Sequence, residues 1–127
     1  MTQALATDRT VYHIATAADL AAAEDAGRYA GSALCRRDGF IHMSTAAQLA
    51  ATLARFFAGR DDIVLLGLDV AGLGDALRWE DVPGVGIFPH YYGAFTADQY
   101  RVLGPIPRDG DGVHRIAALM TAVEGTQ

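Results

Sequence analysis

The sequence predicts a single α+β domain from three observations. Two segments carry helix-capping residues, several short runs are apolar or alternate in the manner of strands, and glycine and proline separate these pieces. The chain has 127 residues, 51% of them hydrophobic, which suits one buried core and is too short for two ordinary domains. We expect the domain to span residues 10–118, between a frayed terminus (1–9) and a C-terminal tail (119–127).

The first predicted elements are a strand and a capped helix. The run VYHIA (11–15) is apolar and bounded by polar residues, so it predicts a short strand. Thr16 can cap the free N–H groups of a following helix, with Asp19 in the capping-box position, and Gly27 suits its end. We expect residues 28–38 to be irregular.

A second strand and helix follow at residues 40–58. Alternation over 40–44 puts Phe40, His42 and Ser44 on one face of the strand and Ile41 and Met43 on the other. Thr45 then begins a helix, and Gln48 completes a second capping box. Helical spacing places four apolar residues on one face, before Gly59 ends the helix: Leu49, Leu53, Phe56 and Phe57.

The rest of the domain is predicted to be mainly extended. The nearly continuous apolar run IVLLGLDV (63–70) predicts a strand buried on both faces. Residues 71–98 predict turns and two short extended pieces, LRWEDV (77–82) and GIFPHYYG (86–93), and the glycines and prolines of 83–89 exclude a helix there. Residues 100–106 and 113–116 are expected to form closing strands.

Charge and composition narrow the functions open to this chain. The net charge is −5 and the ten basic residues, all arginine, are scattered, so we expect no nucleic-acid partner. The absence of lysine excludes Schiff-base chemistry and a P-loop lysine. One cysteine permits no intramolecular disulfide. Without a signal-peptide pattern or a long apolar run, we expect a cytoplasmic protein with no membrane partner.

Three segments around His13, His42 and His90 concentrate the polar residues that can carry chemistry. Ser44 shares a strand face with His42 and, with Thr45, opens a helix whose free N–H groups favour an anion. The same residues are ordinary helix caps, and a half-buried histidine often makes one structural hydrogen bond. Taken alone, this segment fits the structural interpretation better.

The other two segments also have two interpretations. His13, in an apolar strand, needs a partner for its ring nitrogens, either a ligand or a carbonyl. The stretch FPHYYG (88–93) predicts a rigid aromatic loop that suits a flat ligand ring or packing on the core. Glu80, beside Trp79, is either a general base with a raised pKa or a solvated glutamate. The three histidines are too far apart in sequence for a local zinc motif, so no metal ligand is assigned.

These motifs resemble the bacterial domain-of-unknown-function family 952. The resemblance covers about residues 10–107 and rests on YHI (12–14), GRY (27–29), DGFIHMST (38–45) with Gln48, LLGLDV (65–70), RWE (78–80) and FPHYYG (88–93). Met43 stands where many relatives are expected to carry cysteine, so the resemblance implies no essential thiol there.

A more distant resemblance is to the ADP-ribosyltransferase fold, through His13 on the first strand and GFIH (39–42) with Ser44. It implies a small split β-sheet with two principal helices and a site for the nicotinamide and ribose of NAD. The chain departs from many transferases in having no glutamate between FPHYYG and Glu124, so His90 or Glu80 would take that role. The expected catalytic residues are His13, His42, Glu80 and His90. The expected ligand-binding residues are Tyr12, Arg28, Tyr29, Phe40, Ser44, Thr45, Trp79 and Tyr91.

Three functions remain open. The first is a cleft that binds an NAD-like or nucleotide-like small molecule, with or without ADP-ribosyltransferase-type activity. The second is a non-catalytic binding or regulatory module, a homodimer whose contact surface is FPHYYG. The third is a metallohydrolase that uses the three histidines.

Overall fold

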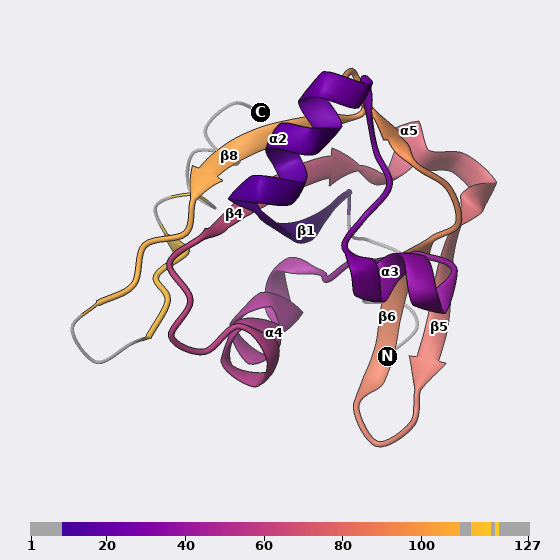
Figure 1. Cartoon of the computed structure of the whole chain (residues 1–127). Helices are drawn as coiled ribbons and strands as arrows, with labels where there is room; N and C mark the ends of the chain where they lie inside the picture. The colour runs from indigo at the N-terminus through magenta and orange to yellow at the C-terminus, as the bar shows by residue number, and fades with distance from the viewer. Residues whose placement is uncertain (1–8, 110–112, 118, 120–127) are drawn as a thin grey trace.

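Short antiparallel sheets and two longer helices build the domain in the computed structural model, which describes residues 9–109, 113–117 and 119 (Figure 1). The strands are β1 (Thr10–Thr16), β2 (Arg28–Tyr29), β3 (Ile41–His42), β4 (Ile63–Asp69), β5 (Leu77–Val82), β6 (Gly86–Tyr91), β7 (Phe95–Thr96) and β8 (Tyr100–Pro105). The helices are α2 (Ala17–Ala26), α3 (Ala33–Asp38), α4 (Leu49–Phe56) and α5 (Val70–Leu73), with 3₁₀ turns at Ala46–Gln48 and Gly74–Ala76. The predicted α+β class is confirmed.

The predicted termini fall almost wholly outside the described residues, which leave out 1–8 and 120–127. Within the described part of the chain, no helix is long and apolar enough to cross a bilayer.

Strand β4 is the centre of the first sheet, whose order is β1-β4-β8. Its alternate side chains enter two different cores: Leu66 and Leu68 pack with α2, while Ile63 and Leu65 pack with α4. Helix α2 therefore covers one face of the strand and α4 covers the other. This arrangement confirms the prediction of a strand buried on both faces, because neither face is left to water.

The capping residues set the helix boundaries as predicted. Thr16 Oγ1 accepts a hydrogen bond from the Asp19 N–H at 3.0 Å, and Gly27 ends α2 in the left-handed conformation. At the second helix, Gln48 Oε1 accepts from the Thr45 N–H at 3.0 Å and completes a capping box. The helical-face prediction is wrong at Phe56, which is 63% exposed, because α4 ends there and its side chain lies at the rim of a cavity.

Residues 28–38 are more regular than predicted. They form β2 and the short helix α3, where Ser32 Oγ accepts from the Cys35 N–H at 3.2 Å and Gly39 ends the helix in the left-handed region. The prediction of an irregular segment is wrong because a six-residue helix carries too short an apolar pattern to stand out. Its two caps were the local signals.

Residues 71–98 confirm the two predicted extended pieces, which form strands at LRWEDV and GIFPHY. Strands β5 and β6 pair over six residues as a regular hairpin, and β6 is the middle strand of the sheet β3-β6-β5. Pro89 lies inside this middle strand, and its carbonyl accepts from the Met43 N–H at 3.1 Å. A proline lacks only the donor, so the strand continues through it.

The second predicted closing strand, at residues 113–116, is not formed. Strand β8 confirms the first closing strand, whereas 113–116 make an isolated bridge, His114 with Arg108, in the described residues.

The segment from Ile41 to Ser44 connects two sheets. It pairs with β6 at Ile41 and His42, and then bonds β1 through reciprocal hydrogen bonds of 2.8 Å between Ser44 and Tyr12. This crossing brings the histidines of β1, β3 and β6 close together.

Gly31 offers a test of how tightly α3 packs. A Cβ at this residue, whose φ is +92°, would lie 2.6 Å from the Cys35 Cβ. We expect Gly31→Ala to lower the free energy of unfolding by about 2–4 kcal/mol, from backbone strain and overpacking together. Gly27→Ala is the matched control, because its φ is +80° but no atom lies within 4 Å. It should cost about 1 kcal/mol in urea unfolding, and equal losses in the two variants would contradict the close packing.

Candidate functional site

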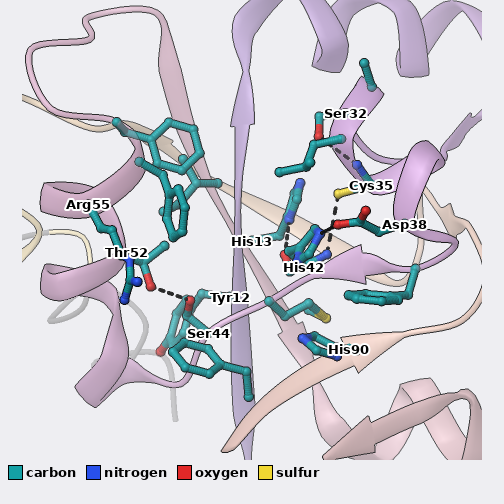
Figure 2. Close-up of a pocket in the computed structure, with 18 of the residues that line it drawn as sticks. Tyr12, His13, Ser32, Cys35, Asp38, His42, Ser44, Thr52, Arg55 and His90 are labelled. Atoms are coloured by element: carbon teal, nitrogen blue, oxygen red, sulfur yellow. Dashed lines mark hydrogen bonds and ion pairs between the residues drawn. The ribbon is translucent and has the colours of Figure 1, made fainter. Parts of the chain in front are cut away.

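A cavity of about 840 Å³ lies between α3 and α4, over β1 and the crossing segment (Figure 2). Nucleotide-sized ligands occupy pockets of about 300–1,000 Å³, so this cavity is large enough for one. Figure 2 shows side chains reaching it from both sides: Thr52 and Arg55 come from α4, and Cys35 and Asp38 from α3. The cavity is therefore assembled from elements that are distant in sequence.

His13 is held between two protein groups beneath this cavity. Its Nδ1 lies 2.6 Å from the His42 carbonyl oxygen, and its Nε2 lies 2.6 Å from the Tyr29 hydroxyl. A carbonyl only accepts, so Nδ1 carries the proton and Nε2 accepts from Tyr29. Burial lowers the pKa of His13 to about 4, so the ring is neutral at pH 7. Of the two partners left open by the sequence, the structure shows the carbonyl, together with a tyrosine.

Tyr29 completes this buried unit. It is 1% exposed, its ring stacks on Phe95 with centroids 6.1 Å apart, and burial raises the pKa of its hydroxyl. The hydroxyl therefore stays protonated and donates to His13. Together, His13 and Tyr29 hold the His42 backbone in place from the core, because His13 donates to the His42 carbonyl.

His90 is held by Glu80. Its Nδ1 lies 2.8 Å from Glu80 Oε1, and the same oxygen accepts from the Tyr92 hydroxyl at 2.7 Å. These two hydrogen bonds lower the pKa of Glu80, and the bond from Tyr92 has the larger effect. The prediction of a raised pKa is therefore wrong, because the carboxylate is stabilised by two donors rather than desolvated. An ionised Glu80 requires His90 Nδ1 to donate.

His42 forms a second carboxylate–histidine pair. Its Nε2 lies 2.9 Å from Asp38 Oδ2, and that bond is the main cause of the lowered pKa of Asp38. The pKa of His42 is lowered too, chiefly by partial burial. Asp38 accepts, so Nε2 of His42 donates and its Nδ1 is left as the second ring nitrogen.

The two pairs meet around Phe40. Its ring stacks on His90 with centroids 4.0 Å apart and lies 4.7 Å from the His42 ring. The His42 and His90 rings are 5.6 Å apart and nearly perpendicular. The two histidines therefore lie close enough to contact one small ligand.

Arginines surround the cavity, although the chain has a net charge of −5. The charged side chains that line it are Arg36, Arg37, Arg55, Arg60, Asp19 and Asp38. Arg37 is 3.3 Å from Asp38, and Arg60 bonds Asp62. Arg55 lies over the Phe56 ring and has no carboxylate partner among the described residues. The cavity thus offers a guanidinium free to meet an anion.

A sequence model described as "Protein of unknown function (DUF952)" matches residues 14–102. The chain belongs to the DUF952 family. It is similar to protein CC0527 from Caulobacter crescentus, whose crystal structure has a TM-score of 0.81 and 34% identity, covering 88% of this chain and 98% of that one. The solution NMR structure of CC0527 gives a TM-score of 0.76 and 35% identity, over 86% and 94% of the two chains. No curated protein matches the chain.

Three DUF952 motifs form one sheet in this structure. Strand β3 carries IH (41–42), β6 carries FPHY and β5 carries RWE, in the order β3-β6-β5. His42 is the direct cross-strand partner of His90, and Glu80 on β5 reaches the His90 ring. The pairing of strands therefore explains why motifs separated by dozens of residues build one site.

The residues predicted from the DUF952 and transferase resemblances divide into two groups. Those that line the cavity are Tyr12, His13, Phe40, His42, Ser44 and His90, and those that do not are Arg28, Tyr29, Thr45, Trp79, Glu80 and Tyr91. Tyr29 and Glu80 lie outside the cavity lining but are hydrogen-bonded to residues in it, Tyr29 to His13 and Glu80 to His90. Ser44 Oγ lies 3.2 Å from Thr52 Oγ1 at the α4 side.

The FPHYYG motif is not a loop, and that prediction is wrong. Residues Phe88 to Tyr91 belong to β6, and Tyr91 is 8% exposed with its ring 5.0 Å from that of Phe95. Tyr91 therefore packs in the core and offers no contact surface, whereas Tyr92 beside it is 38% exposed. A homodimer stays a prediction.

Sequence reasoning missed Asp38 and the arginines. Asp38 had a local signal, since it stands four residues before His42 in the motif DGFIH. Arg55 had none, because only the packing of α4 beside β1 brings it to the cavity.

The three histidines do not form a shared set of metal ligands. Both ring nitrogens of His13 are bonded to protein groups, and the described residues contain no group of three metal-ligating side chains.

Proposed function

We propose that the cavity binds an NAD-like or nucleotide-like small molecule. The observation that carries this proposal is the arginine-rich lining of a large cavity in an acidic protein, with Arg55 free of a carboxylate partner. Guanidinium groups match the geometry of phosphate oxygens and form charge-assisted hydrogen bonds with them.

Aromatic side chains support a ligand that also carries a flat ring. Phe40, Phe57 and Phe88 line the cavity from three different segments of the chain. Stacking on such rings is tolerant of the identity of a base. An anionic group at the arginines and a ring among the phenylalanines together describe a nucleotide.

An ADP-ribosyltransferase-like fold and a transferase-type activity belong to the same proposal. Their support is the resemblance of His13 and GFIH (39–42) with Ser44, and the place of His42 and Ser44 at the cavity. The late carboxylate of such enzymes would be represented by Glu80, acting through His90.

Arg55 gives the direct test of binding. We expect NAD, ADP-ribose or AMP to bind the protein in isothermal titration calorimetry, and Arg55→Ala to weaken the binding about tenfold, by loss of a charge-assisted hydrogen bond. Arg101→Ala is the matched control, because Arg101 is an exposed arginine paired with Asp69 that does not line the cavity. The proposal fails if none of the three compounds binds the wild-type protein at millimolar concentration.

A further inference from the structure

We propose that His42 and His90 act as a general acid–base pair that hydrolyses a phosphodiester bond of a nucleotide-like substrate in this cavity. The inference rests on the proposed function, since the cavity must first hold such a molecule.

Each histidine is oriented for proton transfer by its own carboxylate. Asp38 accepts a hydrogen bond from His42 Nε2 at 2.9 Å, and Glu80 accepts one from His90 Nδ1 at 2.8 Å. A carboxylate at one ring nitrogen sets the tautomer, so the opposite nitrogen is left for the reacting atoms. The two pairs therefore leave His42 Nδ1 and His90 Nε2 for chemistry.

These two nitrogens are reachable from the cavity. Both residues line it, and no protein group among the described residues bonds either nitrogen. Every buried side-chain nitrogen or oxygen of the described residues has a hydrogen-bond partner. An unbonded Nε2 on the otherwise buried His90 must therefore be open to solvent or ligand.

The two histidines are suited to different roles. Partial burial lowers the pKa of His42, so its ring is neutral at pH 7 and can accept a proton. His90, the other histidine that lines the cavity, then serves as the acid, which protonates the leaving oxygen from the Nε2 opposite the nitrogen bonded to Glu80. His42 is accordingly the base and His90 the acid.

The reaction balances with water as the second substrate. A water molecule gives one proton to His42 Nδ1 while its oxygen forms a bond to phosphorus. The bond from phosphorus to the alcohol oxygen breaks, the electron pair stays on that oxygen, and His90 Nε2 gives it a proton. The products are a phosphomonoester and an alcohol. Solvent then returns the proton from His42 to His90, with no change in oxidation state.

The leaving group explains why a phosphodiester fits this pair. An alcohol oxygen leaves as a strong base and must be protonated, which requires an acid opposite the base. Nicotinamide leaves NAD as a neutral molecule and requires no acid. Two oriented histidines 5.6 Å apart therefore supply both the base and the acid that cleavage of a phosphorus–oxygen bond requires.

The test is hydrolysis of 2′,3′-cyclic AMP followed by phosphorus NMR, with NAD as the comparison substrate. We expect turnover of the diester by wild type and a loss of about 100-fold or more in kcat for His42→Ala and for His90→Gln. His114→Ala is the matched control, because His114 bonds the Arg60 carbonyl and does not line the cavity. Its kcat should equal that of wild type. Thermal unfolding and calorimetric binding of AMP show that each variant is folded.

Asp38→Asn and Glu80→Gln separate a positioning role from a structural one. Each should lower kcat about tenfold and change KM less than threefold, because each side chain acts on the reacting atoms through its histidine. Wild type that binds AMP but leaves the diester intact overturns the acid–base inference and leaves the proposed function standing. If neither AMP nor the diester binds, both fail. Release of nicotinamide from NAD without diester cleavage also overturns the inference.

Discussion

Replacing His13 by leucine is expected to lower the free energy of unfolding by about 3 kcal/mol, because two buried polar groups lose their partner. The His42 carbonyl loses its donor at 2.6 Å and the Tyr29 hydroxyl loses its acceptor at 2.6 Å. Both lie next to the core, where His13 is 4% exposed and Tyr29 is 1% exposed. Water has little access to compensate either group.

A double-mutant cycle with Tyr29→Phe measures the coupling directly. Tyr29→Phe alone should cost about 1–2 kcal/mol in urea unfolding, since it leaves His13 Nε2 without a donor. The double variant should lose clearly less than the sum of the two single losses, because each change already breaks the same bond. Strictly additive losses would show that the two side chains are not coupled, and would contradict the hydrogen bond.

The same histidine should make the fold sensitive to acid between about pH 6.5 and pH 4. The pKa of His13 is lowered from 6.5 to about 4 by burial. Between these values the unfolded chain binds a proton at His13 and the folded chain does not, so stability falls as the pH falls. The full shift corresponds to a loss of about 3 kcal/mol in the free energy of unfolding. This loss is absent above pH 6.5 and complete by pH 4.

Urea unfolding at a series of pH values checks this dependence. His13→Leu is the control, because it removes this titrating group and should make the curve shallower between pH 4 and 6.5, where the lowered pKa of His42 still contributes in both proteins. The lowered pKa values of Asp38, Glu80, Asp61 and Asp62 add a further loss at lower pH, common to both proteins. Parallel curves for wild type and His13→Leu from pH 7 to pH 4 would contradict a neutral, buried His13.

The helices show which features local sequence patterns predict. The sequence predicts caps at Thr16 with Asp19 and at Thr45 with Gln48. In the structure α2 begins after Thr16, and the 3₁₀ turn that leads into α4 begins after Thr45. A cap joins residues three positions apart, so every atom of it is present in one short segment. The weaker α3 escaped recognition although Ser32 and Gly39 cap it, since its six residues carry no longer apolar pattern.

The strands show which features local sequence patterns do not predict. The run at 63–70 predicted a strand buried on both faces, and β4 is one. FPHYYG predicted a loop because proline removes a backbone donor, yet β6 is the middle strand of its sheet. The Pro89 carbonyl still bonds Met43, which is far away in sequence, so no local pattern could reveal this pairing.

By itself the sequence determined the α+β class, the two principal helices and the family. Only the tertiary structure decided what each histidine contacts. His13 bonds groups 16 and 29 residues away, and Glu80 is stabilised as an anion by His90 and Tyr92 across a hairpin. Capping and periodicity act between near neighbours along the chain, whereas a pKa and a hydrogen-bond partner depend on which strands lie side by side.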